Sequence, residues 1–179
     1  DLGTGWMATA LATDSEGACA RLDSGEIKCW GHNFYGQLGL GDTANRGDAA
    51  GEMGDALPAA NLGTGRTATA LAAGSRHNSA LLDTGQVKCW GYNAHGQLGL
   101  GDTANRGDMA GEMGDALPAV NLGTSTIALA AANYHTCALL DTGQVKCWGN
   151  NSGGALGLGD TAHRGDMAGE MGSALPAVS

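Results

Sequence analysis

The histidines and the recurring carboxylates are the residues of this chain whose types could do chemistry. The five histidines are His32, His77, His95, His135 and His163. No two of them lie close enough in sequence to form a typical zinc-ligand pair, so a metal site would need residues from several distant segments. The chain contains no G-x-S-x-G elbow, and no pair of carboxylates recurs in a catalytic setting. The sequence therefore predicts no catalytic residues, no metal and no cofactor.

An acidic segment with one arginine occurs three times. Arg46-Gly47-Asp48 recurs at positions 106–108 and 164–166, and its first copy lies among Asp42, Glu52 and Asp55. Such carboxylates could bind Ca²⁺ together with backbone carbonyls, but no D-x-D-x-D-G spacing is present. We leave calcium binding open and favour a solvated acidic loop. In that loop the arginine and an aspartate form the same local ion pair or turn each time, rather than an adhesion motif.

The cysteines suggest disulfide bonds. Two pairs, Cys19 with Cys29 and Cys137 with Cys147, share the same sequence spacing. An antiparallel hairpin with a three-residue loop at 141–143 places Cys137 directly opposite Cys147. Residues that face each other in this way are close enough for a disulfide, and the same count places Cys19 opposite Cys29.

The fifth cysteine, Cys89, faces Ser79 by the same count, so we expect it to be unpaired or intermolecular. The absence of a C-x-x-C cluster argues against metal ligands. Buried reduced thiols are the alternative to the two disulfides. Cross-strand disulfides form in oxidising compartments, so the pairs predict an extracellular or cell-surface protein.

Composition excludes several classes of protein. Of the 179 residues 32 are glycine, which favours a turn-dense fold over a helical bundle. A net charge of -9 argues against a nucleic-acid partner. No apolar run approaches the roughly 18 residues of a membrane span, so we expect no membrane insertion. The chain starts at Asp1 without a signal-peptide pattern, which indicates a mature product or a fragment.

The architecture follows from an internal repeat. The tetrapeptide KCWG occurs at 28–31, 88–91 and 146–149, and it divides the chain into units 1–60, 61–120 and 121–179. Within the second unit we expect strands at 68–73, 79–82 and 86–90, and a fourth, outer strand at 116–120 that carries a proline. Four short antiparallel strands with one tryptophan describe a propeller blade. The sequence thus predicts an all-β fold of three blades, with a glycine-rich β-solenoid as the competing architecture.

The segment from Cys89 to Gly101 carries a family resemblance. It resembles the signature W-G-x-N-x-x-G-Q-L-G-x-G of the regulator-of-chromosome-condensation repeat, which Trp30 to Gly41 also matches. The third unit departs from it at Ala155, where the family has glutamine. The resemblance implies a β-propeller, commonly of seven blades, in a family that includes nucleotide-exchange factors, inhibitors and secreted modules. The charge and the cysteine pairs of this chain disfavour a nucleotide-exchange or chromatin factor.

Differences between the units indicate a candidate binding face. They cluster in the turns at 14–17, 74–77 and 132–135 and in the loops at 32–35, 92–95 and 150–153. Alternate turns of an up-and-down sheet emerge at the same end, so both clusters are expected on one face. The variation indicates either a surface for a protein or glycan partner or drift in unconstrained loops. Aromatic and arginine side chains dominate interfaces, and the expected contact residues are Phe34, Tyr35, Arg76, Tyr92, His95 and Tyr134.

The three tryptophans of the KCWG segments, Trp30, Trp90 and Trp148, are expected to pack between adjacent blades. Propellers close with about four to eight blades, so three blades leave two end faces uncovered. We expect those faces to meet further blades or further copies of the chain, as a ring or as a filament. The resulting hypothesis is a non-catalytic extracellular binding module, with a structural unit that assembles through its blade edges as the alternative.

Overall fold

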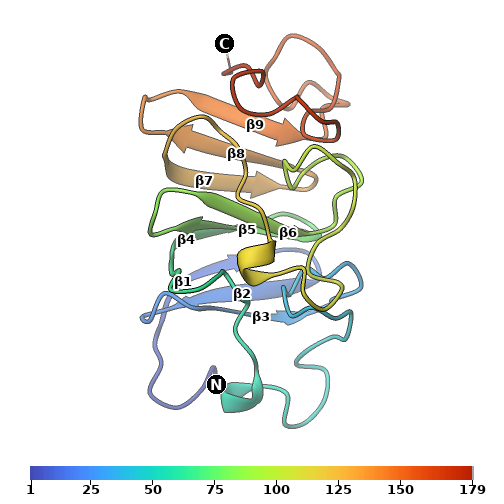
Figure 1. The fold of residues 1–179 in the computed structure, drawn as a ribbon. Helices are drawn as coiled ribbons and strands as arrows, with labels where there is room; N and C mark the ends of the chain where they lie inside the picture. Colours follow the sequence, from blue (N-terminus) through green and yellow to red (C-terminus); the bar gives the residue numbers. More distant parts are fainter. Residues whose placement is uncertain (179) are drawn as a thin grey trace.

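The computed structural model describes residues 1–178 and contains three antiparallel sheets of three strands each. In chain order the strands are β1 (Ala8–Thr13), β2 (Gly17–Leu22), β3 (Ile27–Gly31), β4 (Ala68–Ala73), β5 (His77–Leu82), β6 (Val87–Gly91), β7 (Thr126–Ala132), β8 (His135–Leu140) and β9 (Val145–Gly149). Two short 3-10 turns, η1 (Gly54–Ala56) and η2 (Gly114–Ala116), follow the first and second sheets. Figure 1 shows the sheets stacked in chain order, with the two ends of the chain at opposite ends of the stack. We call the three sheets with their following loops blades 1, 2 and 3.

The hairpin loops between the second and third strands of each blade form as predicted. In blade 3 the Leu140 N–H donates to the Gln144 carbonyl at 2.8 Å, which leaves residues 141–143 as a three-residue loop. Gly143 has a φ of 83°, a left-handed conformation that glycine adopts without strain. This loop sets the register that places Cys137 opposite Cys147, so the predicted register is confirmed.

The predicted fourth strand at 116–120 is wrong. The segment is not part of any sheet in the described chain, since its first residue ends η2. The one backbone hydrogen bond from this segment to β6 runs from the Val120 N–H to the Val87 carbonyl, at 2.8 Å. Pro118 has no N–H to donate, and the tight turn before it prevents a longer ladder.

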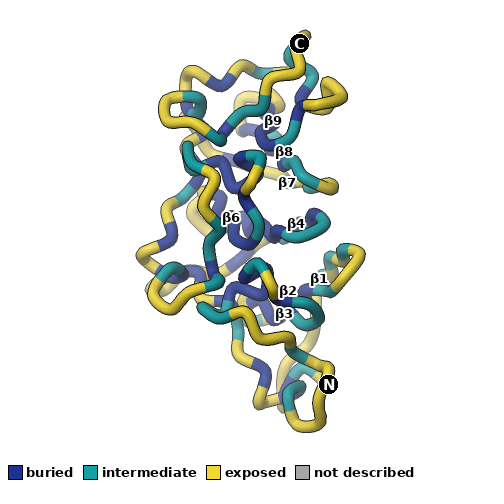
Figure 2. Tube along the Cα trace, turned by 90° about the vertical axis from the view of Figure 1, so that its right-hand side faces the viewer, coloured by how far each residue is buried: buried dark blue, intermediate teal, exposed yellow. Residues whose placement is uncertain are grey.

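The hydrophobic core lies between the blades. One cluster of buried residues joins blades 1 and 2, and a second cluster joins blades 2 and 3. Figure 2 shows the buried segments running along the strands through the middle of the stack, while the connecting loops are mostly exposed. Each sheet therefore depends on its neighbours to bury its apolar side chains, as the units of a repeat protein do.

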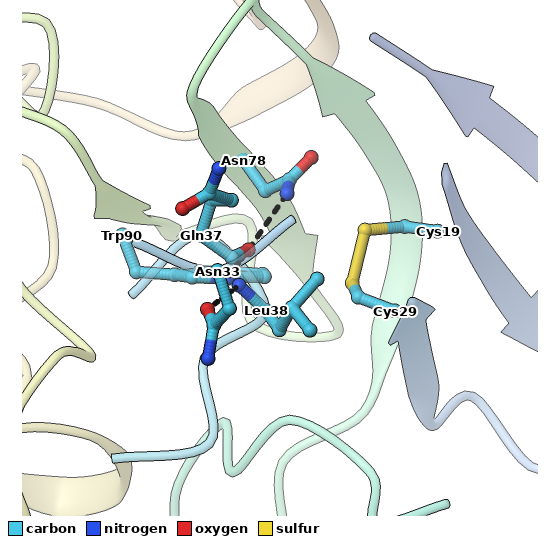
Figure 3. The surroundings of a disulfide bond; sticks show 7 residues. All are labelled: Cys19, Cys29, Asn33, Gln37, Leu38, Asn78 and Trp90. Atoms are coloured by element: carbon cyan, nitrogen blue, oxygen red, sulfur yellow. Dashed lines mark hydrogen bonds between the residues drawn. A yellow bond between two sulfur atoms is a disulfide. The ribbon is translucent and has the colours of Figure 1, made fainter. Parts of the chain in front are cut away.

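The repeated tryptophan forms the centre of both junctions between blades, as predicted for Trp90 and Trp148, whereas Trp30 in blade 1 is only half-buried. Trp90 and Trp148 are fully buried, and their indole N–H groups donate to the carbonyls of Gln37 and Gln97 in the preceding blade at 3.0 Å. Figure 3 shows Trp90 beside Gln37. A Cβ at Gly99 would lie 2.8 Å from the Trp148 nitrogen, so the signature glycine makes room for the tryptophan of the next blade.

A buried lysine ties each unit together, a role that the sequence did not reveal. The Lys88 ammonium donates to the Leu62 carbonyl at 3.0 Å and to the Gly114 carbonyl at 2.7 Å. Lys28 and Lys146 make the corresponding pairs of bonds in blades 1 and 3. These bonds join the first residues of a unit to a turn near its end, which in blades 1 and 2 is η1 or η2. They support our proposal that the structural units are 1–60, 61–120 and 121–179, the last residue lying outside the described part.

Candidate functional site: an aromatic row across three blades

All six residues that the sequence indicated as partner contacts lie together on one face. The structure adds two histidines, and the ring-bearing members form a continuous series that we call the aromatic row. The row consists, in spatial order, of His32, Phe34, Tyr35, Tyr92, Tyr134, His95 and His163. The centroids of successive rings are 4.7 to 6.3 Å apart. The row therefore crosses both junctions between blades.

A buried asparagine positions the loop that carries the rings. In blade 1 the Asn33 amide donates to the carbonyls of Asp42 and Ala44 at 2.8 and 3.0 Å, and its oxygen accepts from the Leu38 N–H at 2.9 Å. Asn93 and Asn151 make the same contacts in the other blades. The asparagine of the signature thus holds a rigid loop. The variable residues that follow it are presented outward.

Ring packing within the row is mostly edge-on. The ring planes of Phe34 and Tyr35 meet at 83°, and those of Tyr92 and Tyr134 at 62°. Edge-to-face contacts of this kind stabilise aromatic pairs by about 0.5–1.5 kcal/mol beyond burial. Phe34 is 65% exposed, whereas the three tyrosines are half-buried. Phe34 therefore offers the most apolar surface to a partner.

Charged groups flank the row at the junction of blades 1 and 2. The Arg76 guanidinium lies 5.2 Å from the Tyr35 ring centroid and donates to the Tyr35 hydroxyl at 3.3 Å. Glu16 approaches both Arg76, at 3.5 Å, and His32, at 3.6 Å. These contacts hold Arg76 against the row. Glu16 belongs to a turn that the comparison of units had singled out, but it was missed because only aromatic and arginine residues were considered.

His163 closes the row in blade 3 and was also missed. It replaces Asn45 and Asn105, whose side-chain oxygens accept a backbone N–H in blades 1 and 2. In blade 3 the Nδ1 atom of His163 accepts the corresponding N–H, from Asn151, at 3.0 Å. Its ring lies 5.2 Å from that of His95. Burial, and then the neighbouring His163, lower the pKa of His95. The departure from the repeated asparagine was the available sequence signal.

The two remaining histidines make no ring contact with the row. His77 is fully buried, and its Nε2 lies 2.9 Å from the Thr136 hydroxyl of the next blade. Burial lowers the pKa of His77 to about 3, so the ring is neutral at ordinary pH. His135 is half-buried, and burial also lowers its pKa.

The structure contains the two predicted disulfides. Cys19 is joined to Cys29 between β2 and β3, as Figure 3 shows, and Cys137 is joined to Cys147 between β8 and β9. Cys89 is a free thiol with no exposed surface, and burial raises its pKa to about 12. A second cysteine could reach this buried sulfur only if blade 2 opened, so of the two expectations we favour an unpaired Cys89.

The acidic loops use their carboxylates internally. Arg46 pairs with Asp42 at 2.7 Å, and the other two blades contain the same pair at 2.6 Å. The predicted local ion pair therefore exists, but it involves the aspartate four residues earlier rather than Asp48. Glu52 accepts hydrogen bonds from the N–H groups of Gly47 and Ala49. Within residues 1–178 no group of three histidine, cysteine or acidic side chains is arranged to hold a metal.

A depression of about 480 Å³, lined by residues 84–87 and 119–126, lies apart from the row at a hairpin loop. It contains no charged side chain and no aromatic ring, so it offers little chemistry for recognition. Among the described residues no helix reaches the length and hydropathy of a membrane span.

Comparison with known families identifies the repeat. The regulator of chromosome condensation (RCC1) repeat matches residues 15–37, 68–97 and 127–155, and a second model of this repeat matches 84–139. The chain belongs to the RCC1 repeat family, and its sheets are RCC1-type propeller blades.

Relatives include proteins of several functions. The chain is 32% identical over 139 residues to the ultraviolet-B receptor UVR8 of Arabidopsis thaliana, and covers 28% of it with 78% of its own length. It is 35% identical over 138 residues to the probable E3 ubiquitin-protein ligase HERC4 of Homo sapiens, covering 12% of that protein with 77% of this chain. The crystal structure of Prp20p from Saccharomyces cerevisiae superposes with a TM-score of 0.70 at 18% identity, over 96% of this chain and 38% of Prp20p. The chain thus spans well under half of each of these proteins.

Proposed function

We propose that this chain is a non-catalytic binding module that holds a protein partner on the aromatic row. The observation that carries the proposal is the continuity of the row. Its seven rings come from all three blades, and each blade's loop is held by a buried asparagine. Aromatic side chains on a rigid support bury large areas at little entropic cost, which is characteristic of interaction hot spots.

A protein partner fits the row better than a glycan. Sugar rings stack on free aromatic faces, whereas most rings here meet their neighbours edge-on and Arg76 lies over Tyr35. Phe34 is an exposed apolar anchor, with Glu16 and Arg76 nearby for hydrogen bonds to a peptide. The acidic charge of the chain also favours partners with a basic surface. Glycan binding is the alternative that an experiment must distinguish from protein binding.

We propose an extracellular or cell-surface location. The support comes from Cys19–Cys29 and Cys137–Cys147, because cross-strand disulfides are rare in reducing compartments. Free-thiol labelling of the protein from its native source tests this. Five labelled thiols in the unfolded, non-reduced chain would contradict it, and one labelled thiol is expected.

The binding proposal is tested with a photo-crosslinking amino acid at Phe34 and, as the control, at Met109. The two side chains are equally exposed, at 65% and 62%, but Met109 is not part of the row. We expect a specific protein adduct from position 34, absent from position 109 and lost when Tyr92 is replaced by alanine. Adducts of equal yield from both positions, or binding to a glycan array that Tyr92→Ala abolishes, would contradict a protein-binding row.

Prp20p of Saccharomyces cerevisiae binds Gsp1p and histones, and the repeat family includes nucleotide-exchange factors, so nucleotide exchange is tested separately. Acceleration of nucleotide release from a small GTPase by this chain would favour it. We expect none, because the chain covers only 38% of Prp20p.

A second candidate function is assembly through the blade edges. The observation that favours it is the exposure of apolar residues at the two ends of the stack. Leu11 in blade 1 is 67% exposed and Val145 in blade 3 is 36% exposed, although the equivalent residues between blades are covered. Further blades of the same polypeptide would cover the same residues, so light scattering tests whether this chain associates by itself: a folded monomer would contradict assembly.

A further inference from the structure

The loop that carries three rings of the aromatic row in blade 1 carries none in blade 3. In blade 1 the rings belong to His32, Phe34 and Tyr35. The equivalent residues of blade 3 are, in the same order, Asn150, Ser152 and Gly153. With the asparagine between them, the first two form the motif Asn-x-Ser, the acceptor of N-linked glycans. The motif occurs at no other place in the sequence.

The motif contains two adjacent asparagines, and only the first is free to be modified. Asn151 is the buried asparagine of the repeat signature, and its amide nitrogen donates to the carbonyls of Asp160 and Ala162 at 3.0 Å. The Nδ2 atom of Asn150 makes no hydrogen bond with the described residues, and it is not enclosed by the fold. The side-chain nitrogen of Asn150 is therefore open to solvent.

The remaining contacts of Asn150 hold the motif in a surface turn directly after β9. Its Oδ1 atom accepts the Ser152 N–H at 3.1 Å, and its own backbone N–H donates to the Tyr134 carbonyl at 2.8 Å. Ser152 is exposed. A group attached to Nδ2 would thus displace none of these hydrogen bonds.

A further blade after blade 3 would leave this turn at the surface. Blade 2 is followed by blade 3, and there Tyr92, at the position of Asn150, is only half-buried, while Ala94, at the position of Ser152, is exposed. Blade 1 is followed by blade 2, and Phe34 at the same position is 65% exposed. The exposure of the motif therefore belongs to this loop of the repeat and does not depend on where the sequence ends.

We propose that Asn150 is a site of N-linked glycosylation. The donor is an oligosaccharide carried on a polyprenyl diphosphate. A bond forms between Nδ2 of Asn150 and the anomeric carbon of the sugar, while the bond from that carbon to the diphosphate breaks. The carrier leaves as the diphosphate, and the amide nitrogen gives one proton to a base of the transferase, so no oxidant or reductant is needed. The proposal rests on the extracellular or cell-surface location proposed above, because this transfer occurs on chains that enter the secretory pathway.

The attached glycan would border the aromatic row. Asn150 contacts the backbone of Tyr134 in blade 3, whereas Phe34 lies at the other side of the row in blade 1. A hydrated glycan beside Tyr134 would keep a protein from the loop of blade 3, which has no ring to offer. The surface for a protein partner would then extend from Phe34 towards Tyr134 and end there.

The test is mass spectrometry of the protein from its native source. Trypsin releases residues 147–164 as one peptide, which contains no other acceptor motif. Treatment with peptide-N-glycosidase in water labelled with oxygen-18 converts a glycosylated asparagine into labelled aspartate. We expect the label at position 150 and none at position 151. Recovery of this peptide only in its unmodified form would overturn the proposal.

Variants secreted from eukaryotic cells assign the motif. Asn150→Gln and Ser152→Ala should each lose the mass of the glycan, and Ser152→Thr should keep it. The positive control is Tyr92→Asn/Ala94→Ser, which builds the same motif in the equivalent loop of blade 2 and should add a second glycan. Glycosylation at position 92 alone, or a glycan that survives Ser152→Ala, would overturn the proposal for Asn150.

Failure of this proposal can be told apart from failure of the proposed location. One free thiol in the native protein, together with an unmodified 147–164 peptide, would overturn the glycosylation site alone. Five free thiols with the same unmodified peptide would overturn the location as well. Neither outcome depends on a partner of the aromatic row.

Discussion

His163 accepts the backbone N–H of Asn151 through its Nδ1 atom at a distance of 3.0 Å. In blades 1 and 2 an asparagine side chain accepts the equivalent N–H, so blade 3 alone uses an imidazole nitrogen for this contact. A ring nitrogen accepts a hydrogen bond only when it carries no hydrogen, so the other nitrogen of His163 must be the donor. The contact also holds the ring that ends the aromatic row, 5.2 Å from the ring of His95.

The first prediction is that His163→Ala loosens the Asn151 loop and that His163→Asn does not. The alanine removes the acceptor of the Asn151 N–H, whereas the asparagine supplies the acceptor that the other two blades use. Hydrogen exchange of the Asn151 amide, corrected for intrinsic rates, should be faster in His163→Ala than in the unmodified chain and unchanged in His163→Asn. The Asn93 amide, which donates to Asn105, is the internal control. Equal loss of protection at both amides would contradict the prediction.

The second prediction concerns acid stability. The pKa of His77 is about 3 in the folded chain and about 6.5 when unfolded. Between these values the unfolded chain binds the additional proton, so the free energy of unfolding falls as the pH falls from about 6.5 to 3. One such group contributes a slope of up to about 1.4 kcal/mol per pH unit. Urea unfolding across this range should show a shallower pH dependence for His77→Gln than for the unmodified chain. The same dependence in both proteins would contradict the prediction.

The repeat made most of the fold predictable from sequence. The hairpin loops, the cysteine register and the burial of Trp90 follow from two local features. Side chains alternate between the two faces of each strand, and a glycine in the turn fixes which residues of the two strands are paired. The fourth strand was predicted from local signals as well, but Pro118 and the preceding 3-10 turn allow only one hydrogen bond to its neighbour. The hydrogen bonds of the Lys88 ammonium could not be anticipated, because their acceptors lie 26 residues before and 26 residues after the lysine in the sequence.

The candidate site was predictable as a set of residues but not as a row. Comparing the units located the variable loops, and residue type selected Tyr35, Tyr92 and Tyr134. That these rings contact one another depends on the spacing of the blades, which the sequence does not contain. His163 was overlooked because it lies 12 residues after Asn151 in the sequence, and only the fold of the loop brings the two together.

The third prediction is that Ser79→Cys creates a third disulfide. Ser79 faces Cys89 across β5 and β6, and its hydroxyl lies 3.0 Å from the Cys89 sulfur. The register is the same as in the two blades that contain disulfides. A loop of this length should stabilise the folded chain by about 2–3 kcal/mol under oxidising conditions. Chemical denaturation should show this gain, and the double variant Ser79→Cys/Cys89→Ser should lack it. An unpaired thiol at position 79 after oxidation would contradict the prediction.

The fourth prediction separates packing from backbone strain at the signature glycine. Gly99 has a φ of 68°, and an added Cβ would lie 2.8 Å from the Trp148 nitrogen and 2.9 Å from a methyl group of Val120. Gly111 has a φ of 87°, but an added Cβ there meets nothing within 4 Å. Both alanine substitutions incur the left-handed backbone cost of roughly 1–2 kcal/mol, and only Gly99→Ala also disturbs the junction, by roughly a further 1–3 kcal/mol.

Urea unfolding of the two alanine variants measures the difference. Gly99→Ala should be less stable than Gly111→Ala, and its tryptophan fluorescence should change because Trp148 must move within the junction between blades 2 and 3. Gly111→Ala should keep the fluorescence of the unmodified chain. If the two variants lost the same stability, the glycine would be needed only for its backbone conformation. The close approach of Trp148 would then not be what places glycine at this position of the repeat.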